Sequence, residues 1–249
     1  MAGLSRPIVL LGAPGAGKGT QAREIAKHFG VPQIATGDMF REHVLRGTTL
    51  GGEAQAVMAR GELVSDEIVI AMVAERIRAP DCQHGFLLDG FPRTVPQAER
   101  LDELLRGRGL GPVLAVSIEV SYDKLFRRLT GRRTCKSCGA IYNIYDRIPR
   151  VANHCDREGG ELVERPDDRE EVIRERLQAY ERETKPLLDY YRQREVLVEV
   201  MGDVPPEELT RQLIQLLEAL PTMPGSPPAP PESLGTEAGP KGGRKSDDC

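Results

Sequence analysis

The pattern of apolar and polar positions predicts strands that alternate with helices. Five short apolar runs have the length and composition of buried strands: 7–11, 31–35, 86–89, 113–118 and 196–200. The fourth run is almost wholly apolar, which is typical of a central strand. The chain is therefore predicted to be an α/β protein with an open sheet, in which ligands bind at the carboxyl ends of the strands.

Two short helices are predicted between the second and third strands. Thr36 can cap a helix over 36–45, and a second helix over 49–60 ends at a glycine. Together they make 36–64 a small helical insertion. One further predicted helix follows the first strand and ends at residue 29, and another has apolar positions from 68 to 77. The remaining predicted helices are 123–129, a long helix that begins at Asp168 and is bent at Pro186, and 205–220.

Composition narrows the class of protein. The 249 residues are 39% apolar and 29% charged, with a net charge of −4, which is typical of a globular protein and argues against a general nucleic-acid or membrane-surface binder. Residues 1–7 carry no export signal and no apolar run approaches about 20 residues, so we expect a cytoplasmic protein. The Pro-, Gly- and Ser-rich segment 221–249 is expected to be a disordered tail.

The segment 12–20, Gly-Ala-Pro-Gly-Ala-Gly-Lys-Gly-Thr, joins the first strand to the first helix. Its glycines let successive N–H groups and the positive end of the helix dipole face one concavity, and Lys18 adds a charge that can reach nucleotide phosphates. The alternative is an ordinary glycine-rich connection. The residue after Lys18 is Gly19 rather than Ser or Thr, so this loop is a doubtful ligand for magnesium.

Other candidate groups follow the third strand. Asp89 ends that strand, where a carboxylate can hold magnesium or its waters, although a turn cap is the alternative. Arg93 leaves the turn that follows, and Gln97 lies one helical turn later on the same side. Arg176 lies beside the apolar stripe of the long helix, where it needs an anion as a partner. On spacing alone Arg41 is a solvated charge; the cluster Arg127, Arg128, Arg132 and Arg133 is either solvated or a phosphate clamp.

Three of the five cysteines are spaced like a zinc ribbon. Cys135-x2-Cys138 is followed by Cys155-x2-Glu158, so a carboxylate stands where a fourth cysteine would be expected. Glu158 can ligate zinc, and His154 is a second candidate. The alternative is a site that has lost its metal and keeps its cysteines as small buried residues.

Taken together, these motifs resemble the adenylate kinase family of nucleoside monophosphate kinases, in its long-lid form. The segments that carry the resemblance are the loop 12–21, Thr-Gly-Asp-Met-Phe-Arg at 36–41, Asp-Gly-Phe-Pro-Arg at 89–93 with Gln97, Gly-Arg-Arg at 131–133, and Arg165 with Arg176. The resemblance covers about residues 6–219.

The resemblance implies a P-loop NTPase-type fold with a five-stranded parallel sheet and flanking helices. It also implies a helical insertion that binds the monophosphate and a zinc-ribbon-like lid. The implied domains are a core of 1–35, 65–130 and 169–220, an AMP-binding insertion of 36–64, and a lid of 131–168, with the tail 221–249 outside them.

The implied activity is the reversible transfer ATP + AMP to 2 ADP by a monomer with Mg²⁺, a structural Zn²⁺, and no nucleic-acid or membrane partner. The implied donor-site residues are Gly15, Ala16, Gly17, Lys18, Gly19, Thr20, Arg128, Arg132, Ile141, Tyr142 and, through its backbone, Gly202. The implied AMP-site residues are Thr36, Arg41, Glu62, Leu63, Val64, Gly90, Phe91, Pro92, Arg93, Gln97, Arg165 and Arg176. The implied catalytic residues are Lys18, Arg93, Arg132, Arg165 and Arg176; the implied metal ligands are Cys135, Cys138, Cys155 and Glu158 for zinc and Asp89, through water, for magnesium.

Phosphoryl transfer fits this set of residues, because it needs positioning and charge neutralisation more than a general base. The insertion and the lid can exclude water by closing over the substrates, and we expect Asp167 and Asp168 to pair with lid arginines on closure. Asp203 and Val204 stand near a place where relatives often have a lysine close to adenine.

Two alternatives remain open at this point. One is a kinase for another monophosphate, such as UMP or CMP, or one that uses GTP as donor; Thr36 and Gln97 favour adenine. The other is a zinc-ribbon binding module with a nucleotide switch. The acidic chain and the few aromatic residues near the ribbon argue against the second.

Overall fold

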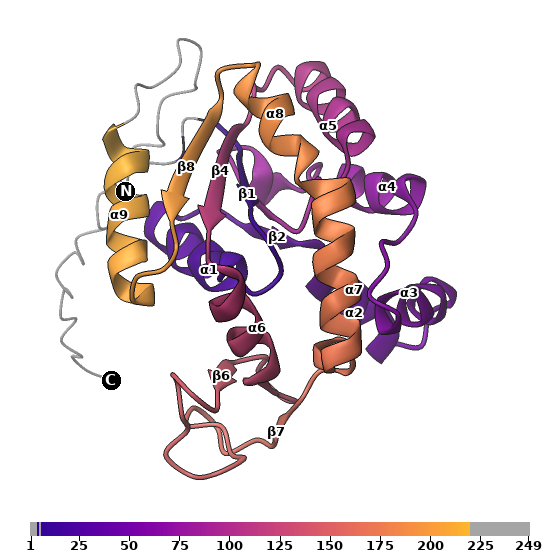
Figure 1. The fold of residues 1–249 in the computed structure, drawn as a ribbon. Helices are drawn as coiled ribbons and strands as arrows, with labels where there is room; N and C mark the ends of the chain where they lie inside the picture. The colour runs from indigo at the N-terminus through magenta and orange to yellow at the C-terminus, as the bar shows by residue number, and fades with distance from the viewer. Residues whose placement is uncertain (1–3, 5, 220–249) are drawn as a thin grey trace, which may run out of the picture.

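The computed structural model describes residues 4 and 6–219, and the segment 221–249 lies outside them. A five-stranded parallel sheet forms its centre, in the order β2-β3-β1-β4-β8 (Figure 1). This confirms the predicted fold class. The strands are β1 (Ile8–Leu11), β2 (Gln33–Ala35), β3 (Leu87–Asp89), β4 (Leu114–Glu119) and β8 (Leu197–Met201).

Alternate residues of each strand enter two apolar clusters on opposite faces of the sheet. Val9 and Leu11 of β1 pack in one cluster, whereas Ile8 and Leu10 pack in the other. Both faces of the central strands β1, β3 and β4 are buried, which is why those strands are almost continuously apolar, whereas the edge strand β8 carries the exposed Glu199.

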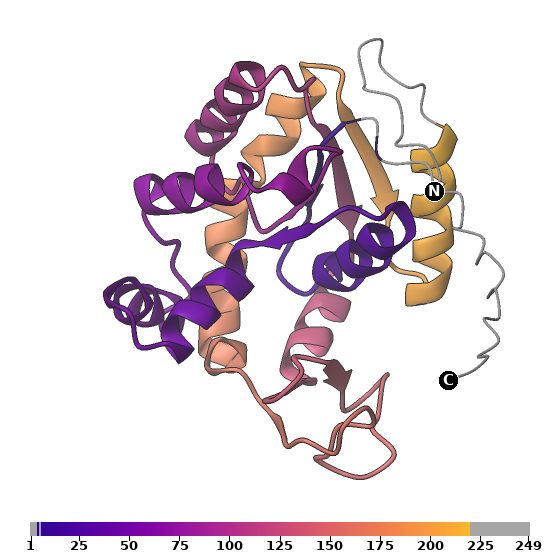
Figure 2. The ribbon, with the colours of Figure 1, turned by 180° about the vertical axis from the view of Figure 1, so that it is seen from behind.

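Helices cover both faces of the sheet (Figures 1 and 2). The cluster that contains Val9 takes side chains from α2 (Thr36–Leu45), α3 (Thr49–Ala59), α4 (Asp66–Arg76), α5 (Val95–Gly107) and α8 (Pro186–Arg192). The other takes them from α1 (Lys18–Phe29), α6 (Tyr122–Thr130), α7 (Glu170–Ala179) and α9 (Pro206–Ala219). None of the helices of the described part is both long enough and apolar enough to cross a membrane.

Two predicted elements begin two residues later than expected, whereas the bounds of the others agree to within one residue. The long helix begins at Glu170 rather than at Asp168, because Pro166–Asp168 forms a 3₁₀ turn and Arg169 is extended. A π-helical segment, Tyr180–Thr184, precedes Pro186, so the helix is interrupted just before the proline rather than at it. The second strand begins at Gln33 rather than at residue 31.

A second, smaller sheet lies apart from the core. It is antiparallel, in the order β6-β5-β7, with β5 (Arg132–Cys135), β6 (Ile141–Asn143) and β7 (Leu162–Val163). We call residues 131–168 the lid segment. Figure 1 shows it beyond α6, at the end of the molecule toward which β4 and β8 point. The carboxyl ends of the parallel strands therefore face the lid segment.

The packing of α9 on α1 makes Leu213 a test of core stability. Leu213 is fully buried, so Leu213→Ala is expected to lower the free energy of unfolding by about 2–5 kcal/mol through lost burial and a residual cavity. Urea unfolding followed by circular dichroism measures the change. The exposed Gln215 on the same helix provides the control Gln215→Ala, which should leave stability within about 0.5 kcal/mol. An equal loss in both variants would contradict the prediction.

Candidate phosphoryl-transfer site

The loop between β1 and α1 has the geometry of an anion cradle. Gly12 has a φ of 135°, and a Cβ there would lie 2.6 Å from the carbonyl oxygen of Ile118, so only glycine fits. Gly17 has a φ of 98° and immediately precedes α1. Lys18 folds back over the loop, and its Nζ donates to the carbonyl oxygens of Gly12 at 2.6 Å and Ala13 at 3.0 Å. The expected donor-loop residues 15–20 thus form this turn and the start of the helix.

Gly19 has a structural reason to lack a side chain. A Cβ at this position would lie 3.1 Å from Oδ2 of Asp89, at the end of β3. The sheet register pairs Asp89 with Leu10, which brings this carboxylate beside the loop. Burial raises the pKa of Asp89, and the nearby Lys18 opposes that rise. Gly19 therefore leaves space for a carboxylate where a Ser or Thr would crowd it.

Lys18 is surrounded by other cations. The pKa of Lys18 is lowered to about 8: burial is the largest cause, Asp89 opposes it, and Arg93, Arg176 and Arg132 add to it. Burial also lowers the pKa of Arg93 to about 10, with Arg176 adding to the effect. Positive charges collected in a buried place are unfavourable unless anions join them. The arrangement is therefore suited to bind several phosphate groups.

Two pockets open beside these charges and share Arg93. The first pocket lies between the Lys18 loop and the π-helical segment Tyr180–Thr184, and Arg176 also lines it. The second pocket lies between α2, α3 and the turn after β3. It is lined by most of the expected AMP-site residues: Thr36, Glu62, Leu63, Val64, Gly90, Arg93 and Gln97.

The turn after β3 fixes Arg93 at the junction of the pockets. Nε of Arg93 donates to the carbonyl oxygen of Gly90 at 2.9 Å, and Thr36 Oγ1 donates to the same oxygen at 2.9 Å. Pro92 lines the first pocket rather than the second. The side chain of Phe91 is buried in the core, which leaves only its backbone to contact a ligand.

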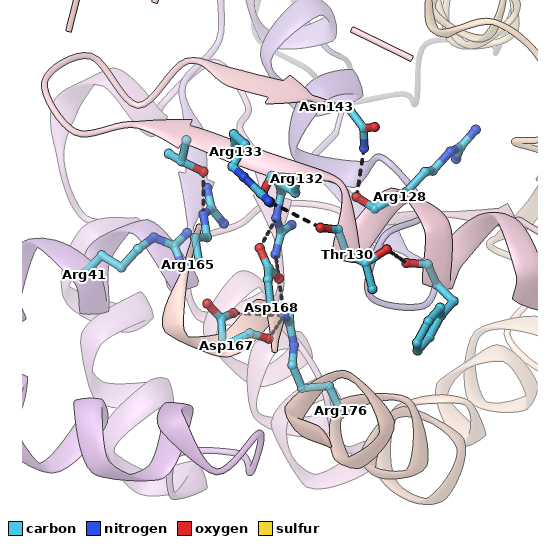
Figure 3. A network of polar contacts seen from close by, with 12 residues as sticks. Arg41, Arg128, Thr130, Arg132, Arg133, Asn143, Arg165, Asp167, Asp168 and Arg176 are labelled. Carbon is cyan, nitrogen blue, oxygen red and sulfur yellow. Dashed lines mark hydrogen bonds and ion pairs between the residues drawn. The ribbon is translucent and has the colours of Figure 1, made fainter. Parts of the chain in front are cut away.

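Two carboxylates connect the lid segment to α7 (Figure 3). Asp168, which is 1% exposed, accepts from Nε of Arg132 at 2.7 Å and from Nη1 of Arg176 at 3.1 Å. Asp167 pairs with Arg176 at 2.9 Å. Burial alone would raise the pKa of Asp167, but Arg176, Arg132 and Arg165 hold it below its usual value. Asp168 is thus paired with a lid arginine, as expected; a role of this pair in closure stays a prediction.

Arg41 and Arg165 come from different elements and point toward one another in Figure 3. Arg41 pairs with Asp38 on α2, and Nε of Arg165 donates to Thr134 Oγ1 at 2.9 Å. Burial lowers the pKa of Arg165 to about 10, and the charges of Arg132 and Arg41 contribute. Arg41 is half-buried and its charge acts on Arg165, whereas its role in binding a ligand stays a prediction.

The remaining residues expected to bind ATP lie in two separate places. Arg128 and Gly202 lie in one, and Ile141 and Tyr142 lie in the other. Nη2 of Arg128 donates to the carbonyl oxygen of Gly202 at 3.0 Å, at the carboxyl end of β8. Lys124 of α6, which the sequence did not single out, donates to the carbonyl oxygen of Asp203 at 3.0 Å. This contact places a cation beside Asp203.

Ile141 and Tyr142 lie in β6 of the lid segment. Tyr142 is buried, and its hydroxyl accepts from the backbone N–H of Asp156 at 2.7 Å and lies 3.6 Å from Sγ of Cys155. The side chain therefore packs inside the lid segment, and contact of these two residues with a nucleotide remains a prediction.

The lid segment brings four potential zinc ligands together. One donor atom from each of Cys135, Cys138, Cys155 and Glu158 lies within 4.8 Å of the others. The sulfurs of Cys138 and Cys155 are 3.6 Å apart, and Cys135 Sγ lies 3.3 Å from Oε1 of Glu158. Tetrahedral zinc needs sulfur–sulfur edges of about 3.8 Å and sulfur–oxygen edges of about 3.5 Å. The set fits zinc, and Glu158 rather than His154 is in the cluster.

Comparison with known proteins now decides the family. A family model described as adenylate kinase matches residues 10–196. The chain belongs to the adenylate kinase family. Proteins named adenylate kinase are 52% identical over 202 residues in Thermodesulfovibrio yellowstonii, covering 81% of this chain and 94% of the relative, and 47% identical over 206 residues in Archaeoglobus fulgidus, covering 83% and 95%. One from Moorella thermoacetica is 53% identical over 195 residues, covering 78% and 90%. The resemblance stated from the motifs is thereby confirmed.

One residue that contacts the lining of the second pocket had no signal in the sequence. Asp66 begins α4 and looks like an ordinary acid in the first turn of a helix. In the structure its carboxylate accepts from Nε2 of Gln97 at 2.6 Å and from Oγ1 of Thr94 at 2.8 Å. The contact joins residues 31 positions apart, so spacing along one helix cannot reveal it.

The four lid ligands predict a zinc dependence of stability. Chelation of zinc is expected to lower the melting temperature, because bound metal stabilises only the folded lid segment. Glu158→Gln should weaken zinc binding at least about 10-fold, because a neutral amide replaces a charged ligand. Competition with a chromophoric chelator measures the affinity. The control is Glu161→Gln, in the same segment but paired with Lys136. Equal zinc affinity in both variants would contradict the assignment of Glu158.

The buried ammonium of Lys18 predicts proton uptake on nucleotide binding. Its pKa of about 8 means that the free chain loses this charge as the pH rises through 8, and a bound phosphate raises the pKa again. ATP binding at pH 9 should therefore take up as much as about one proton, and almost none at pH 6.5. Calorimetry in buffers of different ionisation enthalpy measures the uptake. Lys18→Arg should show a much smaller uptake at pH 9, because Arg93 and Arg165, with pKa values of about 10, are still mostly charged there. Equal uptake in the variant and the wild type, or its absence in the wild type, would contradict the assignment.

Proposed function

We propose that the chain catalyses the reversible reaction ATP + AMP to 2 ADP. The observation that carries the proposal is that Arg93 lines both pockets, with Lys18 and Arg176 beside it in the first. Two nucleotides, one on the Lys18 loop and one in the second pocket, would bring their phosphates together at Arg93. The family membership supports the same reaction.

The arginines supply most of the chemistry that this reaction needs. The transferring phosphoryl group spreads negative charge over its oxygens, and fixed guanidinium groups aimed at that charge lower the barrier. Lys18 and Arg132 approach from the donor side, and Arg93 and Arg176 hold the junction. Arg165 and Arg41 complete the ring from the lid segment and α2. No general base is needed, because the attacking group is already a phosphate oxygen.

Mg²⁺ is the proposed companion of ATP. When bound, it would neutralise charge on the donor phosphates and orient them. Asp89 is the carboxylate placed to hold its waters, and Gly19 keeps the space beside that carboxylate open. Gln33 Nε2 donates to Asp89 Oδ2 at 3.4 Å, which leaves the other oxygen for the metal's waters.

We propose the same domain limits that the sequence suggested: a core of 1–35, 65–130 and 169–220, an AMP-binding insertion of 36–64 and a lid of 131–168. The lid and the insertion stand on either side of α7 at the carboxyl ends of the strands (Figures 1 and 2). Closure of both would exclude water and prevent hydrolysis of ATP. A cytoplasmic monomer is the form in which we expect the protein to work.

Arg93→Ala provides the direct test of this function. The wild-type chain should form ADP from ATP and AMP in a coupled assay, and Arg93→Ala should lower kcat/KM by about 10³-fold or more, because a contact made mainly in the transition state is lost. Arg100→Ala, an exposed arginine on α5 paired with Glu103, is the matched control and should be unaffected. Wild-type preference for CMP or UMP over AMP would overturn the acceptor assignment, and preference for GTP over ATP would overturn the donor assignment.

A further inference from the structure

Both polar atoms of the Gln97 side chain are already engaged from the protein side. Oε1 accepts from the backbone N–H of Arg93 at 2.7 Å, and Nε2 donates to Oδ1 of Asp66 at 2.6 Å. Gln97 is 1% exposed and lines the second pocket. An amide oxygen has two acceptor positions and an amide nitrogen has two hydrogens, so one of each remains for a ligand.

The two partners allow only one orientation of this amide. A 180° flip would place Nε2 against the N–H of Arg93, a donor against a donor, and Oε1 against the carboxylate of Asp66, an acceptor against an acceptor. Asp66 is itself held by Thr94, whose Oγ1 donates to Oδ2 at 2.8 Å and accepts from the N–H of Gln97 at 3.3 Å. Buried donors and acceptors left without partners make the flipped state unfavourable.

The fixed orientation distinguishes two purines of the same shape. The Watson–Crick edge of adenine offers an N6 donor beside an N1 acceptor, which matches the free acceptor on Oε1 and the free hydrogen on Nε2. Hypoxanthine offers the reverse, an O6 acceptor beside an N1–H donor, and so does guanine. A freely rotating glutamine would bind either edge by flipping, so the orientation itself carries the selectivity.

We propose that Asp66 is a positioning residue that makes the acceptor pocket selective for a 6-aminopurine over a 6-oxopurine monophosphate, by preventing the Gln97 amide from flipping. The inference rests on the proposed function, because it assigns the second pocket to the acceptor nucleotide. Asp66 acts through Gln97, and its carboxylate is needed for orientation rather than for contact with the base.

The wild-type chain tests the orientation without any substitution. With ATP as donor, kcat/KM is measured for AMP, for the 6-unsubstituted purine ribonucleotide, and for IMP. A fixed amide predicts the order AMP, then the unsubstituted purine, then IMP, with IMP on the order of 10³-fold or more below AMP, because IMP opposes both groups whereas the unsubstituted purine lacks one bond. A freely flipping amide would make IMP better than the unsubstituted purine, and that order would overturn the proposal.

Asp66→Asn tests the role of the carboxylate. Its amide can accept from Nε2 of Gln97 or donate to a flipped Oε1, and it keeps the shape of the side chain. The backbone N–H of Arg93 still favours the original orientation, so the selectivity is expected to fall rather than to vanish. The ratio of kcat/KM for AMP to that for IMP should fall by about 10-fold or more, with KM for ATP unchanged. Glu67→Gln, an exposed acid in the same turn of α4, should keep the wild-type ratio. A purely structural role of Asp66 would lower activity with both nucleotides and leave their ratio unchanged, which would overturn the proposal.

The two proposals fail in different ways. If the wild-type chain forms no ADP from ATP and AMP, the proposed function fails first. If that activity is present and Asp66→Asn retains the wild-type ratio, only the role of Asp66 fails. The nucleotide order in the wild type decides the orientation of Gln97 even if Asp66→Asn does not fold.

Discussion

The structure depends on holding like charges together in a place with little water. Arg93, Arg132 and Arg176 lie close enough to Lys18 to lower its pKa, and all four side chains are half-buried at the carboxyl ends of the strands. Asp168 partly offsets two of them. The rest of the positive charge is left for a ligand, so the protein gives up some stability to be ready for phosphate. The parallel sheet makes this possible, because its strand ends bring the Lys18 loop and the turn carrying Arg93 to one edge.

The pattern of the sequence was sufficient to predict the sheet, and its motifs named residues that line the two pockets, although their roles in binding stay predictions. The strands are short and mostly apolar because both faces of the sheet are covered by helices. This apolar pattern can be recognised in the sequence without knowing which helices cover each strand. Several parts of the site are local motifs, and their residue spacing is enough to predict their geometry. They are the loop before Lys18, the turn before Arg93, and Cys135 and Cys138 followed by Cys155. Errors arose where tertiary contacts override local signals: Asp168 looked like a helix start, but its carboxylate is held by Arg132 and Arg176, and the helix begins at Glu170.

Contacts between distant segments were the part that the sequence could not predict. Asp66 is an unremarkable acid at a helix start until α4 and α5 pack together and place it against Gln97. Arg41 has the spacing of a solvated residue until the lid segment brings Arg165 toward it. Lys124 of α6 contacts Asp203, which lies 79 positions away in the chain. Each of these interactions joins two residues that are far apart in the sequence, so the sequence around one residue does not indicate its partner.

The pairing of Arg132 with Asp168 has a consequence for how the chain is assembled from parts. These residues stand at the two ends of the lid segment, so the segment leaves and rejoins the core at one closed neck. A segment closed in this way resembles an inserted module, whose interior can change in length or composition while the host fold stays intact. Changes inside the lid segment would then reach α7 through Arg132, Asp168 and Arg176, and would reach α6 through Asn143, whose Nδ2 donates to the carbonyl oxygen of Arg128 at 3.0 Å.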